Sequence, residues 1–256
     1  MARVLAVVNQ KGGVGKTTTS VNLAAALAQA GRRVLLVDLD PQGNATMGSG
    51  VDKRNLARTV YHVVLGLAEL ADVRVRVERG GFDLLPANRE LAGAEIELVA
   101  LDARETRLKD ALERVRDDYD FVLIDCPPSL SLLTVNGLTA AQRVVIPMQC
   151  EYYALEGLSD LVATIKRVRA HLNPHLEIAG LLRTMYDPRN TLSLQVSQQL
   201  EQHFGDKVYR TLVPRNVRLA EAPSYGVPAV LWDQASKGAQ AYLALAAEIL
   251  AQGHAA

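Results

Sequence analysis

The sequence has few cysteines and no long hydrophobic run. Only two of its 256 residues are cysteine, Cys126 and Cys150. Two isolated thiols cannot form the disulfide network of a small secreted protein, and they belong to no Cys/His cluster of the kind that binds zinc. No window of about 18 apolar residues occurs, and the N-terminus has no signal-peptide core. These absences predict a cytoplasmic protein with two buried, structural cysteines.

The sequence also has no excess of charge of either sign, with 28 Lys and Arg against 28 Asp and Glu. A net charge of zero gives no overall attraction to nucleic acid or to an anionic membrane, so any such binding requires a local patch. A hydrophobic fraction of 49% in a chain of this length is enough for a substantial core. The composition therefore indicates a globular protein and excludes disordered and collagen-like classes.

Short aliphatic runs alternate with longer amphipathic stretches along the chain. We expect strands at 3–8, 34–37, 82–85, 121–124, 143–147, 178–184 and 208–213. We expect helices at 16–30, 59–65, 103–115, 155–172, 192–204 and 239–250, and a loop over residues 42–50. Strand–helix alternation is typical of a parallel sheet covered on both faces, so the sequence predicts a doubly wound α/β fold with a mostly parallel sheet. No change of composition marks a boundary, and we expect one domain over residues 1–256.

The first predicted strand and helix are joined by a glycine-rich loop. The residues with phosphate-binding chemistry are Lys11, Gly12, Gly13, Val14, Gly15, Lys16, Thr17 and Thr18. The glycines let successive N–H groups turn toward one point, and the helix that follows directs its positive dipole end there. The Lys16 ammonium can bind the β- and γ-phosphates, and the Thr17 hydroxyl can ligate Mg²⁺. The loop therefore predicts a nucleoside triphosphate site, although Gln10 stands where the standard pattern has glycine.

The string KGGVGKTT resembles the deviant Walker A motif of the ParA/MinD family of P-loop ATPases, whose signature is an additional lysine, here Lys11. Further segments resemble the chromosomal ParA (Soj) branch, in order along almost the whole chain. They are VLLVDLDPQGNAT (34–46), FVLIDCPPS (121–129), QCEYYALEGL (149–158), TMYD (184–187), PRNVRLAEAPSYG (214–226) and SKGAQAYLALAAEIL (236–250). The resemblance implies a P-loop NTPase fold, ATP and Mg²⁺ as cofactors, and slow ATP hydrolysis that a partner stimulates.

Three aspartates follow predicted strands. Asp125 ends the strand at 121–124, where a carboxylate can hold a water of the Mg²⁺ shell; the alternative is a turn carboxylate bound by local N–H groups. Asp38 and Asp40 end the strand at 34–37, and we expect their side chains to point to opposite sides, so that only one faces the phosphate loop. In the family, the aspartate matching Asp40 positions the attacking water. This leaves Asp38 as either an Mg²⁺-shell residue or a structural one.

The resemblance gives Lys11 and Gly12 a role between subunits. In the family, two ATP-bound subunits face each other, and each contributes the lysine matching Lys11 to the phosphates of the other. A contact with phosphate in its own subunit is the alternative. The residue matching Gly12 lies where the two backbones approach closely, so a side chain there should block the homodimer. An arginine supplied in trans is worth roughly 10³–10⁵ in rate, and we expect less from a lysine, which lacks the guanidinium fork.

Pro214, Arg215 and Asn216 follow the last predicted strand and, by resemblance, line the adenine pocket. Proline fixes the backbone here, so that neighbouring carbonyl and N–H groups can contact the edge of the base. The Asn/Thr-Lys-x-Asp string of guanine-specific proteins does not occur, and its nearest match, residues 184–187, lacks the lysine. We therefore expect ATP rather than GTP.

Residues 205–218 carry four cations against one acid, a local charge of 4 − 1 = +3. The cations are Lys207, Arg210, Arg215 and Arg218. In the Soj branch, arginines matching Arg189 and Arg218 contact DNA in the dimer. This implies nonspecific binding to double-stranded DNA, a location on the nucleoid and a ParB-type centromere-binding partner. The alternative is that each of these cations is a solvated surface charge.

Two other functions are compatible with a nucleoside triphosphate site. A membrane-cycling MinD-type regulator ends in a basic amphipathic helix, whereas no Lys or Arg follows Lys237, and the tail over 243–256 lacks bulky aromatics; we expect no membrane binding. The second alternative function is that of a metabolic relative, such as a small-molecule ligase or an iron–sulfur carrier. A bridging iron–sulfur cluster would need a second thiolate near Cys126, and Cys150 does not lie in a matching motif. The scattered histidines do not support a metal other than Mg²⁺.

Overall fold

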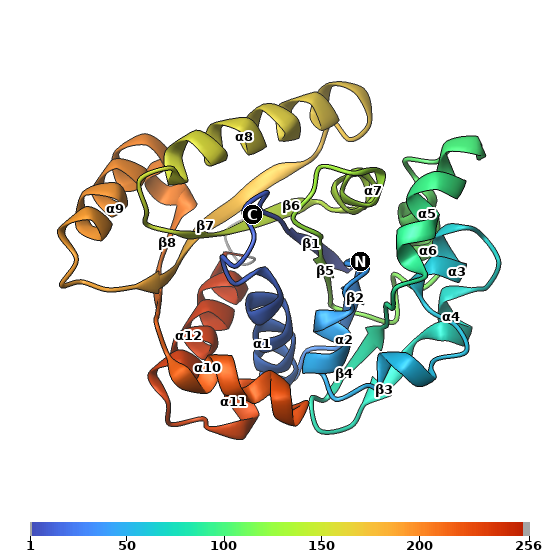
Figure 1. Cartoon of the computed structure of the whole chain (residues 1–256), viewed down its shortest axis with the longest axis horizontal. Coiled ribbons are helices and arrows are strands. Elements are labelled where there is room, and N and C mark those ends of the chain that lie inside the picture. The colour runs from blue at the N-terminus through green and yellow to red at the C-terminus, as the bar shows by residue number, and fades with distance from the viewer. Residues whose placement is uncertain (1, 253–256) are drawn as a thin grey trace.

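The computed structural model describes residues 2–252. Their strands form one eight-stranded sheet in the order β3-β4-β2-β5-β1-β6-β7-β8 (Figure 1). The strands are β1 (Arg3–Val7), β2 (Val34–Asp38), β3 (Val75–Val77), β4 (Phe82–Leu85), β5 (Phe121–Asp125), β6 (Arg143–Gln149), β7 (Glu177–Tyr186) and β8 (Val208–Pro214). All neighbouring strands are parallel except β3 and β4. The predicted α/β fold with a mostly parallel sheet is confirmed.

Helices cover both faces of the sheet. They are α1 (Lys16–Gln29), α2 (Asn44–Gly48), α3 (Val60–Val64), α4 (Leu70–Val73), α5 (Leu91–Glu97), α6 (Arg107–Glu113), α7 (Leu132–Ala140), α8 (Ala154–His171), α9 (Thr191–Phe204), α10 (Val217–Glu221), α11 (Ala229–Trp232) and α12 (Lys237–Ala251). Helices α1, α11 and α12 pack on one face, and α3, α5, α6, α7 and α8 pack on the other, so that two hydrophobic layers enclose the sheet (Figure 1).

The central strands explain where a site can form. Every residue of β2 and β5 is buried, as expected for parallel strands with helices on both sides. Strand β5 pairs with both β1 and β2, and Asp125 at its end is in register with Val7 and with Asp38. The loops after these strands therefore meet at one edge of the sheet, outside the carboxyl ends where α/β folds bind ligands.

The structure departs from the predicted elements mainly between residues 42 and 140. The expected loop at 42–50 contains α2, which is anchored because Thr46 donates from its N–H and its hydroxyl to Asp38. The helix predicted over 103–115 is shorter than expected and spans only α6, and Ala103 is excluded from it by a left-handed backbone (φ 52°). The sequence pattern does not predict β3, α5 or α7. Most residues of α7 are buried, so it has no one-sided hydrophobic pattern to detect.

The other predicted helices are confirmed with small shifts at their ends. The tail over 243–256 belongs to α12 as far as the structure describes it, and residues 253–256 lie outside the described residues. Among residues 2–252, no helix has the length and apolar character needed to cross a membrane. One domain over 1–256 stays a prediction, with which a single sheet built from both halves of the chain is compatible.

Candidate active site

The phosphate loop lies between β1 and α1 at the carboxyl edge of the sheet. Gly13 and Gly15 adopt φ angles of 75° and 88°, which a residue with a side chain would adopt only under strain. Lys16 begins α1, and its ammonium turns back to donate to the carbonyl of Lys11 at 3.0 Å. Burial lowers the pKa of Lys16, and nearby carboxylates oppose this shift. A cation thus lies inside a curl of backbone, as a phosphate site requires.

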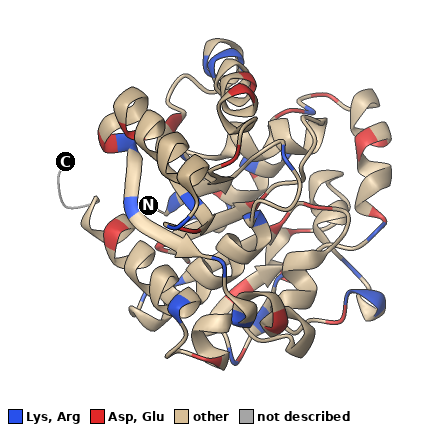
Figure 2. Cartoon of the chain, turned by 60° about the vertical axis from the view of Figure 1, so that its left-hand side comes forward, with Lys and Arg blue, Asp and Glu red and all other residues tan. Residues whose placement is uncertain are grey.

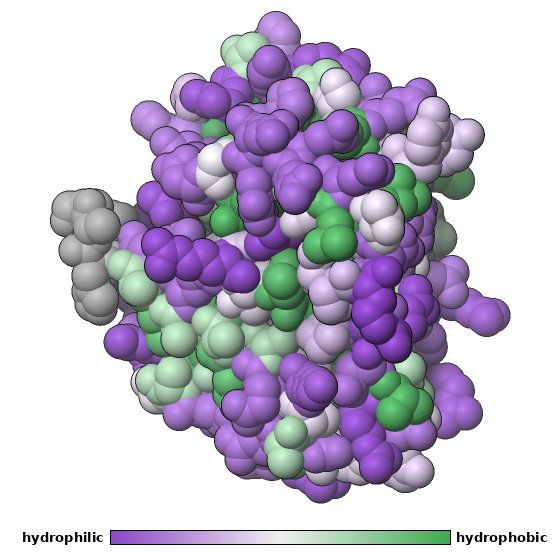
Figure 3. All heavy atoms as spheres, turned by 90° about the vertical axis from the view of Figure 1, so that its left-hand side faces the viewer, coloured by the Kyte–Doolittle hydropathy of each residue, from purple (hydrophilic) through white to green (hydrophobic). Residues whose placement is uncertain are grey.

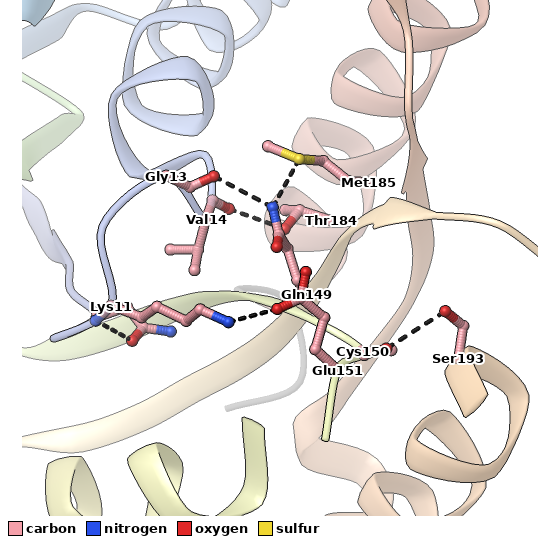
Figure 4. Close-up of polar contacts among 10 residues, drawn as sticks. Lys11, Gly13, Val14, Gln149, Cys150, Glu151, Thr184, Met185 and Ser193 are labelled. Atoms are coloured by element: carbon pink, nitrogen blue, oxygen red, sulfur yellow. Dashed lines mark hydrogen bonds and ion pairs between the residues drawn. The ribbon is translucent and has the colours of Figure 1, made fainter. Parts of the chain in front are cut away.

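Two side chains from the neighbouring strands hold this loop (Figure 4). Gln149, at the end of β6, donates from Nε2 to the carbonyl of Gly13 at 3.2 Å. Thr184 of β7 donates from its hydroxyl to the carbonyl of Val14 at 2.8 Å. These two residues are not among the predicted site residues. Their signal is a polar residue near the end of a hydrophobic strand, in the strings QCEYY and TMYD.

Asp125 and Thr17 are brought together as the sequence predicts. The Thr17 hydroxyl donates to Oδ2 of Asp125 at 2.8 Å, and the hydroxyl of Ser20, one turn later on α1, donates to Oδ1 at 2.9 Å. Asp125 is fully buried, and burial, reinforced by the charge of Asp38, raises its pKa to about 7. The carboxylate is therefore bound by helix hydroxyls rather than by turn N–H groups, which argues against the purely local alternative.

Asp38 and Asp40 differ in how their carboxylates are used. The Oδ2 atom of buried Asp38 accepts from the N–H and the hydroxyl of Thr46 at 2.8 and 2.7 Å, and its Oδ1 accepts from the N–H of Asp40 at 3.2 Å. Burial raises the pKa of Asp38 to about 6. Within residues 2–252, the Asp40 carboxylate accepts a single bond, from the N–H of Gln42 to Oδ1 at 2.9 Å. Asp40 therefore keeps Oδ2 for another partner.

The prediction that these two side chains point to opposite sides was wrong in its premise. Side chains two residues apart on an extended strand share a face, and β2 ends at Asp38 in any case. Hydrogen bonding rather than alternation separates the two roles. Asp38 fixes α2 to the sheet, whereas Asp40 lies close enough to Lys16 for its charge to oppose the lowering of the lysine's pKa.

Lys11 and Gly12 lie on the exposed rim of the loop. The Lys11 side chain is 46% exposed, and its ammonium pairs with Glu151, which follows β6 (Figure 4). A Cβ built on Gly12 would meet no atom within 4 Å. The subunit itself thus has room for a side chain at position 12, and any requirement for glycine there must come from outside it.

A pocket of about 200 Å³ adjoins the phosphate loop at Gly15 and Thr18. Its lining includes Pro214, Arg215 and Asn216, so the structure brings the predicted base-binding segment next to the loop. The side-chain oxygen of Asn216 is occupied, because it accepts from the N–H groups of residues 218 and 219 at the start of α10. Backbone groups of residues 214–216 and the Asn216 amide nitrogen therefore remain the candidates for contacting a base.

A second pocket, of about 280 Å³, lies on the other side of Thr18. Its lining is mainly aliphatic, with Val21, Met47 and Pro223 among its residues. The Asn22 side chain in this pocket is already occupied, since it donates to the carbonyl of Thr18 and accepts from a backbone N–H of α11. The polar groups of Asn22 are thus committed within the subunit.

The four cations grouped by the sequence lie at two ends of β8. Lys207 precedes the strand, and Arg210, near its start, lines a cleft with Glu201 and Glu248. Arg215 and Arg218 follow the other end of this seven-residue strand, about 20 Å away. The structure therefore does not join the four into one continuous patch, because a strand separates residues that are near in sequence.

Two arginines at the carboxyl edge, Arg189 and Arg218, are paired within the chain. Arg189, whose side chain is 88% exposed, binds Asp187 at 2.9 Å. Arg218 binds Glu221 and Asp233, each at 3.1 Å, and lies 5.5 Å from the ring of Trp232. Positive and negative residues are interspersed over the side of the molecule drawn in Figure 2.

Comparison with known proteins identifies the family. A family model described as an AAA domain matches residues 2–178. The chain is 55% identical to the sporulation initiation inhibitor protein Soj of Bacillus subtilis, with 99% of this chain and 100% of that protein covered. It is 54% identical to the chromosome partitioning protein ParA of Caulobacter vibrioides, with 98% and 94% covered. The chain belongs to the ParA family of P-loop ATPases.

A crystal structure from Mycobacterium smegmatis extends the likeness of this ParA-type chain to three dimensions. It is described as cobyrinic acid a,c-diamide synthase with bound ADP and magnesium. It matches with a TM-score of 0.88 and 44% identity, over 100% of this chain and 96% of that one. The predicted family, fold and ATPase activity are therefore confirmed. The prediction of buried cysteines holds as well, since Cys126 and Cys150 are 1% and 5% exposed and burial raises the pKa of both thiols.

Proposed function

We propose that this ParA-type ATPase binds ATP and Mg²⁺ at the carboxyl ends of β1, β2 and β5 and forms a homodimer with the nucleotides between the subunits. The dimer binds double-stranded DNA without sequence preference. Hydrolysis, slow alone and stimulated by a ParB-type partner, releases the DNA, and repeated cycles drive chromosome or plasmid partitioning. The observation that carries the proposal is that Lys11 and Gly12 are exposed on the rim of a loop whose other cation, Lys16, is buried.

The residues beneath the loop fit a magnesium ion. Because Thr17 gives its hydroxyl hydrogen to Asp125, the lone pairs of its oxygen are left for a cation, and oxygen donors with water are the ligands that Mg²⁺ prefers. Thr17 would bind the ion directly and Asp125 through water, while Asp38, whose oxygens already accept three bonds, would act at most through water. Bound Mg²⁺ supplies positive charge that offsets charge developing on phosphate oxygens.

In this proposal Asp40 orients the attacking water through its unoccupied Oδ2 atom. Lys16 binds the phosphates within the subunit, and Lys11 reaches the phosphates of the second subunit. Adenine occupies the pocket at Pro214, Arg215 and Asn216, where backbone groups contact its edge. Residues 12–18 supply the remaining phosphate contacts through N–H groups and the Thr17 and Thr18 hydroxyls. Each contact uses a group that the fold already holds near the carboxyl edge of the sheet.

Arg189 and Arg218 lead the proposed DNA contacts. They follow the carboxyl ends of β7 and β8, and Arg215 is near enough for its charge to act on Asp187, the partner of Arg189. DNA phosphates must displace exposed ion pairs, which costs little. Dimerisation doubles the number of cations, and nonspecific affinity grows with the number of phosphates neutralised. Lys207 and Arg210 lie at the opposite end of β8, and the proposal does not depend on them. DNA binding would place the protein on the nucleoid in the cytoplasm.

The alternatives have less support. The small-molecule ligase is the activity named for the mycobacterial structure, but the partitioning proteins of Bacillus and Caulobacter are more similar, at 55% and 54% identity against 44%. A membrane role is disfavoured because α12 packs its Tyr242, Leu245 and Ile249 into the core. The side of the molecule that carries α9 and β8 is mainly hydrophilic, with hydrophobic residues in small groups (Figure 3).

The proposal is tested by the change of Asp40 to Ala, with molar mass measured by light scattering after size-exclusion chromatography. With ATP and Mg²⁺, the variant should remain a dimer and stay on a DNA duplex, whereas the wild type returns to monomers as ATP is consumed. Steady-state hydrolysis by the variant should fall at least about 100-fold, the lower end of what general-base or water-positioning groups contribute. Normal hydrolysis by the variant, or a wild type that stays monomeric with a non-hydrolysable analogue, contradicts the proposal.

A further inference from the structure

The signature lysine has a partner inside its own subunit. The Lys11 ammonium forms an ion pair with Glu151, and the two side chains are 46% and 49% exposed (Figure 4). The backbone N–H of Lys11 donates to Oδ1 of Asn9 at 3.0 Å, which fixes the start of the side chain. A group that we assign to the phosphates of a second copy is thus held by a carboxylate of the first.

Glu151 is presented by a turn that is anchored on both sides. Its N–H donates to the carbonyl of Gln149 at 3.0 Å, and Gln149 in turn donates to the carbonyl of Gly13 in the phosphate loop at 3.2 Å. On the other side, the Ser193 hydroxyl in the first turn of α9 donates to the carbonyl of Cys150 at 3.3 Å. The carboxylate therefore meets Lys11 without reorganisation of the turn.

We propose that Glu151 is a positioning residue that restrains Lys11 in the free subunit, and that this restraint competes with the contact of Lys11 in the dimer. The inference rests on the proposed function, since it requires Lys11 to act in trans. One ammonium cannot serve both partners. A triphosphate carries more negative charge than one carboxylate and displaces it, whereas a diphosphate lacks the terminal group and competes less well. Glu151 thereby makes dimerisation depend more strongly on the γ-phosphate.

The size of the effect follows from the exposure of the pair. Half-exposed ion pairs shift an equilibrium constant by up to about fivefold. Dimerisation breaks two such pairs, one in each subunit. Removal of the restraint should therefore tighten the dimer by up to about 25-fold.

The matched variants are Glu151→Gln and Glu156→Gln. Each removes one negative charge at nearly constant shape, and Glu156 is an exposed residue in the first turn of α8 that forms no ion pair within residues 2–252. The first measurement is the rate at which a lysine-acylating reagent modifies Lys11 in the nucleotide-free monomer, followed by peptide mass spectrometry. Loss of the ion pair should raise this rate severalfold in Glu151→Gln, because the carboxylate no longer holds the Lys11 amine and the reagent can approach it more freely. Glu156→Gln should match the wild type.

The second measurement is the dimer dissociation constant with a non-hydrolysable ATP analogue and Mg²⁺, from analytical ultracentrifugation. We expect a value up to about 25-fold lower for Glu151→Gln and an unchanged value for Glu156→Gln. Faster acylation of Lys11 with an unchanged or weaker dimer overturns the proposal, and so does unchanged acylation. A wild type that fails to dimerise with the analogue refutes the proposed function instead, and the acylation rates still report whether Glu151 restrains Lys11.

Discussion

Two groups of charged residues at the carboxyl edge of the sheet are held in opposite ways. Beneath the phosphate loop, Lys16, Asp38 and Asp125 are buried, with exposures of 7%, 0% and 0%, and each is bonded to backbone or hydroxyl groups. On the rim, Lys11 and Arg189 are 46% and 88% exposed and pair with exposed carboxylates. The inner group has one arrangement before any ligand arrives, whereas exposed ion pairs exchange partners at little cost. Fixed geometry suits the chemical step, and exchangeable pairs suit contacts that form and break with each cycle.

The largest effect should come from the inner group, through the change of Lys16 to Ala. The variant loses the only ammonium inside the described part of the loop, and charge-assisted hydrogen bonds contribute about 1.5–3 kcal/mol each. ATP affinity should fall by about 100-fold or more, measured by calorimetry or with a fluorescent analogue. Lys11→Ala is the control from the rim and should bind ATP nearly as well as the wild type while failing to dimerise. Equal losses of ATP affinity in the two variants would erase the distinction between inner and outer groups.

Valine at Gly12 and valine at Gly13 should disturb different steps, although the two glycines are neighbours. In Gly12→Val the added Cβ meets no atom within 4 Å in the subunit, so we expect ATP binding to change by less than about twofold. Dimerisation with a non-hydrolysable analogue should be lost, because the added atoms occupy the space that a second backbone needs. In Gly13→Val the positive φ of 75° makes valine strained, and the loop itself should fail, with weaker ATP binding. Light scattering and calorimetry on both variants separate the two failures, and a dimeric Gly12→Val contradicts the assignment.

The sequence predicts some residues of this edge and misses others, according to how far along the chain their partners lie. The loop at 11–18 and Asp125 are predictable because each follows a buried aliphatic strand, and parallel strands bring their ends to one edge. Gln149, Thr184 and Glu151 escape prediction, since their partners are about 136–170 positions away and only the packing of β6 and β7 beside β1 brings them together.

The rim also shows why a proposed DNA-binding surface is poorly predicted from the sequence. Four cations within residues 205–218 appear as one cluster, yet Arg210 lies near the start of β8 and Arg215 follows its other end. Charged residues that are close in sequence form one surface patch only where the chain folds back and brings them together. A strand of seven residues separates its two ends by about 20 Å.

The burial of the inner group should appear in the pH dependence of stability. Burial raises the pKa of Asp125 to about 7, above its unfolded value near 4. Between these values the folded chain binds a proton that the unfolded chain does not, so the free energy of unfolding falls as pH rises from about 4 to about 7. In nucleotide-free protein with a chelator present, Asp125→Asn should raise this free energy at pH 8 by on the order of 1–3 kcal/mol.

Asp120 provides the control of opposite sign. Hydrogen bonds from Arg33 lower the pKa of Asp120, so its charged form is stabilised in the folded state. Asp120→Asn should therefore lower the free energy of unfolding at pH 8, by a small amount because the pair is exposed. Urea unfolding at pH 5 and pH 8 measures both variants. If Asp125→Asn lowers the free energy of unfolding at pH 8, then the buried carboxylate does not destabilise the nucleotide-free subunit.

The smallest effect should come from the rim, through the change of Arg218 to Glu. We expect DNA affinity to fall by about tenfold, since one phosphate contact is replaced by repulsion, and the slope of log affinity against log salt to become shallower by about one per arginine lost. ATP-dependent dimerisation should be unchanged.

Arg116→Glu is the matched control. Arg116 pairs with Glu113 as Arg218 pairs with Glu221, three residues apart in each case, but Arg116 precedes β5 at the opposite edge of the strands. Fluorescence anisotropy with a DNA duplex at several salt concentrations gives both the affinity and the slope. Equal losses in the two variants would mean that DNA responds to net charge alone, and loss of dimerisation in Arg218→Glu would make Arg218 part of the inner, structural group.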